Sequence, residues 1–267
     1  MQSSQIFEIS TLKSILILFG AYIFSYCLGL LFHEMGHALA YLIVGVSDIE
    51  IHVHPFTLSY CSHGFRPTEV LPFTGSMGPL FHILCATIVT LSLWRVRNPK
   101  LLPLLMWAGT AYIAEGVAMF LDIMDLPILT DWGKVIIIGG VSPILMGIIG
   151  IIFIIIGSIF LLLILPLANI SVRDSFWKRY LITTSFSLYF LLSVIYSSIF
   201  DIHVLENRLI AFSSTILFNI LLTSLYKPIF PFLDKLSHTD TRKVSWSSVK
   251  IALGLAVGIV IIFFVFF

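Results

Sequence analysis

Residues 12–44 read LKSILILFGAYIFSYCLGLLFHEMGHALAYLIV, and this stretch decides the fold class. It is almost wholly apolar and longer than the roughly 20 helical residues that cross the hydrocarbon core of a bilayer. We therefore expect a membrane-spanning helix whose part after His33 tilts or leaves the membrane. The preceding residues 1–10 have no basic segment, and the run contains no small-residue cleavage site. This predicts a retained helix and not a signal peptide.

The composition of the whole chain agrees with a membrane location. Of the 267 residues, 58% are hydrophobic and only 11% are charged, and the mean hydropathy is +1.05. These values differ strongly from those of soluble domains. The net charge is only +1 and no concentrated basic surface is apparent, so we expect no nucleic-acid partner. Cys27 and Cys85 fall inside apolar runs, and no disulfide framework is implied.

Six further apolar runs of spanning length follow the first. They predict an all-α polytopic membrane protein with about seven transmembrane helices. We expect Pro143 to divide the fourth run into a short piece and a full span, because proline interrupts a helix. The seven predicted spans cover about residues 12–44, 75–94, 101–121, 135–165, 181–200, 209–226 and 249–267.

The candidate chemistry lies in the first part of the chain. We therefore divide the chain into a catalytic membrane core, residues 1–165, and a three-helix membrane extension, residues 166–267. The extension carries few ionisable groups in its spans, and the sequence assigns it no role.

The charges of the loops predict the orientation in the membrane. Short cytoplasmic loops are enriched in Lys and Arg. With the N-terminus in the cytoplasm, all of the 15 lysines and arginines except Arg66, Lys134 and Arg208 fall on the cytoplasmic side. The C-terminus is then extracytoplasmic, and the end of the first span lies near the outer face.

Between the first two spans, residues 49–60 read IEIHVHPFTLSY. Apolar and polar residues alternate at the start of this segment, which is typical of a strand. The pattern predicts a short β-hairpin-like segment. Two roles are open for it: pairing with an extended substrate through its edge, or capping the helices.

The strongest chemical signal is the sequence HEMGH at residues 33–37. In a helix, His33 and His37 lie on one face and can bind one Zn²⁺ through imidazole nitrogens. Glu34 lies about 100° around the helix, where its carboxylate is suited to take a proton from water at the metal. Three ionisable side chains in one turn of an apolar segment are expensive to bury, which favours a functional site over a purely structural one.

A catalytic zinc needs a third protein ligand, and a carboxylate is a common partner of two histidines. The sequence offers Glu115 in the third span and Asp122, Asp125 and Asp131 after it. The charge count places the aspartates on the same side as the end of the first span, which favours them. Glu115 is left with three roles: pairing with a group of the site, lining a water path, or bonding a neighbouring helix.

Several other residues have simpler interpretations. The remaining candidate metal ligands are histidines that we expect to be solvated or hydrogen-bonded: His52, His54, His63 and His82. Gly75 and Gly78 are expected to permit close packing of helices.

With HEMGHALA at residues 33–40 and DLPILTDWG at residues 125–133, the chain resembles the site-2 protease family of intramembrane zinc metalloproteases. The resemblance covers about residues 12–165. It implies that Glu34 is the general base. It also implies that His33, His37 and Asp131 are the three zinc ligands.

Two features depart from the family pattern. Trp132 separates Asp131 from Gly133, whereas the family more often has Asp-Gly directly. The charge count also places the site near the outer face, whereas many family members hold zinc nearer the cytoplasmic face.

The resemblance implies an intramembrane zinc metalloprotease that hydrolyses peptide bonds in or near membrane-embedded segments. Its cofactor is Zn²⁺, and its partners are a membrane-protein or membrane-peptide substrate and the lipid bilayer. One alternative is a divalent-metal transporter, which should distribute ligands along a path through both leaflets. Another is a catalytically inactive metal-binding membrane protein of the same fold. The substrate and the oligomeric state are not encoded in any recognisable feature.

Overall fold

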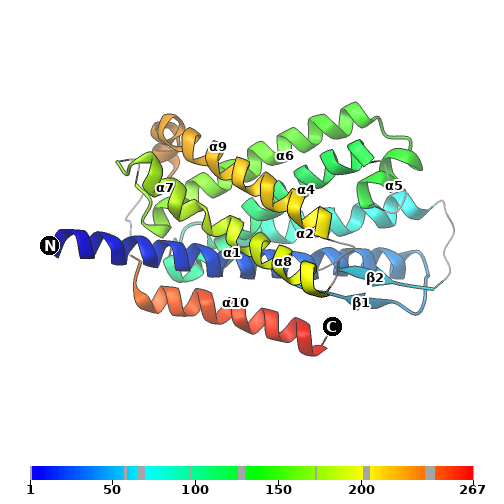
Figure 1. Cartoon of the computed structure of the whole chain (residues 1–267). Coiled ribbons are helices and arrows are strands. Elements are labelled where there is room, and N and C mark those ends of the chain that lie inside the picture. The colour runs from blue at the N-terminus through cyan, green and yellow to red at the C-terminus, as the bar shows by residue number, and fades with distance from the viewer. Residues whose placement is uncertain are drawn as a thin grey trace.

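Long apolar helices run along the long axis of the molecule (Figure 1). The computed structural model describes residues 2–56, 59–64, 70–96, 98–125, 130–171, 173–200, 205–237 and 244–266. Its α-helices are α1 (Gln2–Ile43), α2 (Leu71–Leu93), α3 (Leu102–Leu105), α4 (Trp107–Asp125), α5 (Asp131–Ile137), α6 (Pro143–Ile164), α7 (Phe176–Thr183), α8 (Ser185–Phe200), α9 (Leu205–Ser237) and α10 (Trp246–Phe266). Two 3₁₀ turns, η2 (Pro99–Leu101) and η3 (Leu165–Ala168), precede α3 and follow α6.

The all-α membrane fold predicted from the sequence is confirmed. Within the described part of the chain, six helical segments are long and apolar enough to cross a membrane. They are Ile9–Ile43, Leu71–Leu93, Pro99–Met124, Pro143–Ala168, Phe176–Phe200 and Trp246–Phe266. The remaining predicted span, residues 209–226, lies within α9, which is not among these six but packs against α7 and α8.

The predicted interruption before Pro143 is also present. Helix α5 ends at Ile137, and Gly140 has a φ of +68°, a left-handed conformation that glycine adopts without steric cost. Pro143 then occupies the first turn of α6, where its missing N–H needs no partner. The short α5 and the full span α6 are therefore separate helices.

Small residues let the central helices approach closely. A Cβ atom added at Gly157 of α6 would lie 2.7 Å from the carbonyl oxygen of Gly109 in α4, and one added at Gly116 would lie 2.7 Å from that of Gly150. Helix packing in membranes depends on such close backbone contacts, because lipid gives no hydrophobic driving force between helices. Glycines of both helices thus allow the backbones of α4 and α6 to pack closely.

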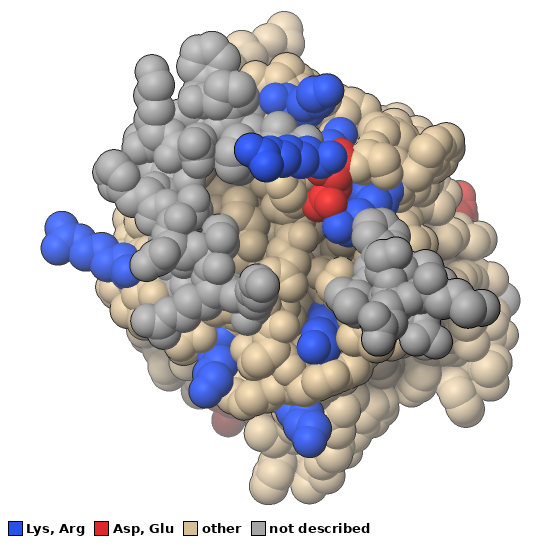
Figure 2. All heavy atoms as spheres, turned by 90° about the vertical axis from the view of Figure 1, so that its left-hand side faces the viewer, with Lys and Arg blue, Asp and Glu red and all other residues tan. Residues whose placement is uncertain are grey.

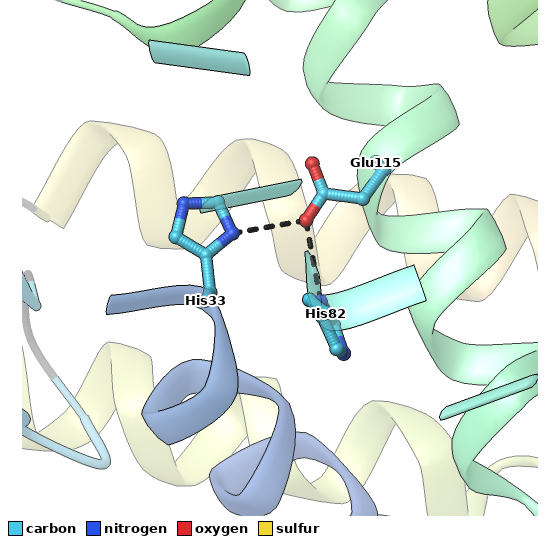
Figure 3. Close-up of side chains that lie close together, drawn as sticks. All are labelled: His33, His82 and Glu115. Atoms are coloured by element: carbon cyan, nitrogen blue, oxygen red, sulfur yellow. Dashed lines mark hydrogen bonds and ion pairs between the residues drawn. The ribbon is translucent and has the colours of Figure 1, made fainter. Parts of the chain in front are cut away.

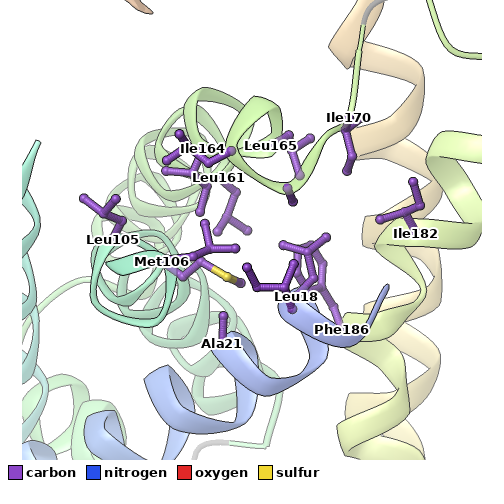
Figure 4. Packing of buried hydrophobic residues seen from close by; sticks show 14 of the residues in the cluster. Leu18, Ala21, Leu105, Met106, Leu161, Ile164, Leu165, Ile170, Ile182 and Phe186 are labelled. Carbon is purple, nitrogen blue, oxygen red and sulfur yellow. The ribbon is translucent and has the colours of Figure 1, made fainter. Parts of the chain in front are cut away.

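A large apolar cluster lies away from the polar residues of the first span. Figure 4 shows residues of α1, α3, α6 and α8 meeting around Met106, which precedes α4. The cluster includes Leu18, Ala21, Leu105, Leu161 and Phe186, all nearly inaccessible to solvent. Helix α10 packs along α1, where a Cβ atom at Gly20 would lie 2.8 Å from the carbonyl carbon of Ala252.

The predicted hairpin after the first helix is confirmed. Strands β1 (Glu50–His52) and β2 (Tyr60–Ser62) are antiparallel, with Ile51 opposite Cys61. The connection after β1 packs against α8: the Tyr189 hydroxyl donates to the Pro55 carbonyl, and the Ser193 hydroxyl donates to the Phe56 carbonyl over 2.8 Å. The Phe56 ring also contacts Phe264 of α10. Residues 57 and 58 lie outside the described part of the chain.

Basic side chains gather over the end of the molecule that carries the N-terminus (Figure 2). Figure 1 places the start of α1, α7 and the start of α10 at this end, and Lys13 of α1 lies over the ring of Trp246, the first residue of α10. Of the three basic residues expected on the other side, Lys134 lies in α5. Arg66 and the side chain of Arg208 lie outside what the structure describes.

The glycine contact between α4 and α6 predicts a stability effect. Gly157→Ala should destabilise the protein by about 1–3 kcal/mol, because the new methyl group overlaps the Gly109 carbonyl oxygen. Thermal unfolding in detergent measures this change. Gly258→Ala in α10 is the matched control, since no atom lies within 4 Å of the added Cβ. Equal unfolding temperatures for the two variants would contradict the proposed packing.

Candidate metal centre

The last part of α1 carries the HEMGH sequence into the interior of the bundle. His33 and His37 lie on one face of the helix, with ring centroids 4.9 Å apart, as the spacing predicts. Glu34 and His37 are only 5% and 6% exposed. The ionisable side chains are therefore buried and need compensating partners.

Asp131 reaches the same place from the first residue of α5. Its Oδ2 atom lies 2.8 Å from Nε2 of His33 and 3.1 Å from Nε2 of His37. Thr130 caps α5 by accepting a hydrogen bond from the Gly133 N–H, which fixes the residue that precedes Asp131. The structure thus brings together the two histidines and the aspartate named from the sequence.

The surroundings of Asp131 favour its ionised form. Burial by itself raises the pKa of the carboxyl, but hydrogen bonds from His33 and His37 and the positive charge on these rings outweigh it. The pKa of Asp131 is consequently held well below its usual range. The second oxygen, Oδ1, accepts a hydrogen bond from Lys134 over 3.2 Å. An ionised carboxylate can accept from several donors or bind a cation.

A second polar group lies on the other side of the His33 ring. Figure 3 shows Glu115 of α4 between His33 and His82 of α2. Its Oε1 atom is 3.1 Å from Nδ1 of His33 and 3.3 Å from Nδ1 of His82. Its Oε2 atom accepts a hydrogen bond from the indole N–H of Trp132 over 3.4 Å. Of the roles left open for Glu115, the structure supports pairing with a group of the site.

Among the described residues, two sets of three side chains place one possible ligand atom each within 4.8 Å of one another. They are His33, His37 and Asp131, and His33, His82 and Glu115. Imidazole nitrogens and carboxylate oxygens are common donors for divalent metal ions. The donor types of both sets therefore fit a metal ion.

The other aspartates have different positions. Asp122 accepts a hydrogen bond from the Trp132 backbone N–H over 3.1 Å and so supports the start of α5 without joining either set. The side chain of Asp125 lies outside the described part of the chain. His82 is buried within α2 and hydrogen-bonded to Glu115, one of the two expected outcomes, but its place in the second set of possible ligands is not predicted from the sequence. Its position inside an apolar span was the signal that could have identified it.

A cavity of about 270 Å³ adjoins the site. His33 and Glu34 line it from α1, Glu115 lines it from α4, and Ser59 lines it from the segment before β2. The buried Oε2 atom of Glu34 has no hydrogen-bond partner among the described residues. A buried carboxylate oxygen without a partner is costly, which points to a bound group or water at this position.

Close approach of α1 and α2 shapes the site. A Cβ atom added at Gly36 would lie 2.5 Å from the Met77 carbonyl oxygen, and one added at Gly78 would lie 2.3 Å from Nε2 of His37. His37 also lies with Nδ1 2.7 Å from the Thr74 carbonyl oxygen of α2. The expected close packing at Gly78 is therefore confirmed, and it fixes the ring of His37.

This contact gives a testable consequence. Gly78→Ala should displace the His37 ring and weaken divalent-metal binding by about tenfold or more, comparable to losing a group that orients a ligand. Metal titration of the purified protein measures the change. Ser76→Ala is the control, because the Ser76 hydroxyl donates to the Phe73 carbonyl of its own helix and Ser76 belongs to neither set of possible metal ligands. Unchanged affinity in Gly78→Ala would show that His37 does not bind the metal.

Comparisons of this chain with protein families, with curated proteins and with solved structures found no match. A function for the chain is therefore inferred from its residues and from the geometry of this site.

Proposed function

We propose that the chain is an intramembrane zinc metalloprotease in which His33, His37 and Asp131 bind Zn²⁺ and Glu34 is the general base. The observation that carries the proposal is the contact of one carboxylate oxygen with two imidazoles. Oδ2 of Asp131 lies 2.8 Å and 3.1 Å from the Nε2 atoms of the two histidines of HEMGH. Two histidines and one carboxylate are a common protein ligand set of catalytic zinc.

The hydrogen bonds of His37 support binding through Nε2. The Thr74 carbonyl can only accept, so Nδ1 of His37 carries the proton that it receives. Nε2, which donates to Asp131 when no metal is bound, is then the nitrogen whose lone pair would bind the ion once its proton is lost. This is the usual arrangement of a metal-binding histidine, whose other nitrogen donates to an oxygen acceptor.

The surroundings of Glu34 support a role as proton acceptor. Zinc supplies Lewis acidity, which lowers the pKa of water at such a site toward 7. The Glu34 carboxylate would take a proton as water attacks the peptide carbonyl, and would return it to the leaving amine. Its unpartnered Oε2 atom and its place on the cavity wall leave it available for this transfer.

The cavity supports access of water and substrate. It is lined along α1 and α4 as far as Ser25 and Thr110, and His33, Glu34 and Glu115 add polar side chains to its wall. A substrate helix must unwind locally to use the site, because its carbonyls are otherwise held in intrahelical hydrogen bonds. A membrane-embedded substrate helix that unwinds near the hairpin end of the bundle meets these requirements.

The distribution of polar groups favours a protease over a transporter. The candidate ligands of the described residues lie toward the hairpin end of α1, whereas α1 contributes apolar residues to the cluster at the other end. A permeation path would need ligands along both halves of the bundle. A non-catalytic metal-binding protein would gain nothing from the costly burial of Glu34.

The same proposal includes the orientation. With the basic end in the cytoplasm, the N-terminus is cytoplasmic and the hairpin lies toward the outer face. Helices that start at the basic end, such as α10, then finish outside.

Glu34→Gln tests the catalytic assignment. The change keeps the shape of the side chain but removes the base, so cleavage of a membrane-peptide library should fall by about 10²–10⁴-fold while zinc content is retained. Asp131→Asn should instead lower zinc content. Zinc analysis beside the cleavage assay separates the two effects. A wild-type protein that binds zinc but cleaves no peptide would contradict the protease assignment.

Cys61 in β2 tests the orientation. In a variant with Cys27→Ser and Cys85→Ser, a membrane-impermeant maleimide added to intact cells should label Cys61, which is half-buried in the hairpin. Further replacement with Cys61→Ser gives the background signal. Labelling that appears only after the membrane is opened would reverse the orientation.

A further inference from the structure

We propose that Glu115 is a positioning residue that fixes the ring of His33 for metal binding, and that His82 and Trp132 hold Glu115 in place. The inference rests on the proposed zinc site. It assigns Glu115 and His82 to the support of that site and not to a second ligand set.

Glu115 is buried among hydrogen-bond donors. It lies inside α4 and is only 4% exposed. A carboxylate at this depth is unfavourable unless donors surround it. Both of its oxygens are engaged, Oε1 by the two histidines and Oε2 by the indole N–H of Trp132. Because Trp132 can only donate, Oε2 is an acceptor in this contact.

The contact with Glu115 determines which nitrogen of the His33 ring is left for a metal ion. An ionised carboxylate only accepts, so Nδ1 of His33 carries the proton in its contact with Glu115. Nε2 donates to Oδ2 of Asp131 over 2.8 Å when no metal is bound, and it is the nitrogen whose lone pair would bind the ion once that proton is lost. The Thr74 carbonyl fixes His37 in the same way. Both rings thus present Nε2 to the same carboxylate oxygen.

The geometry of the His33 ring favours a supporting role for Glu115 over a role as metal ligand. The two nitrogens of an imidazole lie on different sides of the ring. An ion held by Nε2 of His33, Nε2 of His37 and Asp131 therefore lies across the ring from Glu115. A metal held by Glu115 would have to use Nδ1 of His33 and would exclude His37. The HEMGH spacing would then have no role.

Glu115 connects several helices of the site. Its partners come from α1, α2 and α5, and one of them, Trp132, directly follows Asp131. A single carboxylate thus orients one metal-binding histidine and contacts the helix that supplies the aspartate. Removing it should loosen the metal site without removing a ligand.

Zinc affinity and the spectrum of the Co²⁺-substituted protein test this inference. Glu115→Gln should weaken zinc binding by about tenfold and Glu115→Ala by up to about 100-fold, the range found for groups that orient metal ligands. Saturated protein should still bind one zinc ion. The visible Co²⁺ bands should keep their positions in Glu115→Gln and shift in Asp131→Asn, because only the latter changes the ligands.

Thr110→Val is the matched control, because Thr110 lines the same cavity from α4 but its hydroxyl donates to the carbonyls of Met106 and Trp107. His82→Gln should weaken zinc binding in the same direction by less than Glu115→Ala. This second variant tests the inference even where a Glu115 variant does not fold.

The outcomes separate this inference from the proposed function. Wild-type zinc affinity in both Glu115 variants, or in His82→Gln where they do not fold, would overturn the positioning role while leaving the protease assignment intact. A Co²⁺ spectrum in Glu115→Gln that shifts as in Asp131→Asn would make Glu115 a ligand and also overturn it. A wild-type protein that binds no zinc would overturn both proposals.

Discussion

Oδ2 of Asp131 lies within hydrogen-bonding distance of the Nε2 atoms of two histidines, and the arrangement of the surrounding helices depends on this shared contact. Ionisable groups inside an apolar bundle are unfavourable unless they compensate one another. Here the carboxylates of Asp131 and Glu115 face the two nitrogens of His33. The start of α5 is in turn held by the Thr130 cap and by the carboxylate of Asp122. Each local interaction therefore contributes to the position of one oxygen atom.

The close packing of α1 against α2 explains the glycine within HEMGH. Helices α1 and α2 meet where Gly36 faces the Met77 carbonyl and Gly78 faces His37. Any larger side chain at either position would overlap its neighbour. The chemistry requires histidines four residues apart, whereas the packing requires a small residue between them. The two requirements are independent, and the pentapeptide satisfies both.

Features that depend on local sequence could be predicted, whereas those that depend on packing could not. Helix length, the break at Pro143 and the common face of His33 and His37 follow from the periodicity and composition of single segments. Asp131 was named through the family resemblance, and three other carboxylates remained open beside it. The partner of His82 could not be predicted, because it lies on another helix, and no pattern within α2 indicates that α4 brings Glu115 next to His82. The division at residue 165 stays a prediction.

The packing of α10 along α1 has a consequence for biosynthesis. Among the described helices, α10 is translated after all others, yet it contacts α1, the helix that carries HEMGH, through Gly20 and Ala252. During synthesis this side of α1 faces lipid or insertion machinery until α10 emerges. The hairpin likewise lacks its contact with Phe264 until then. The helix that carries the histidines therefore acquires its contact with α10 only after all the other described helices have been made.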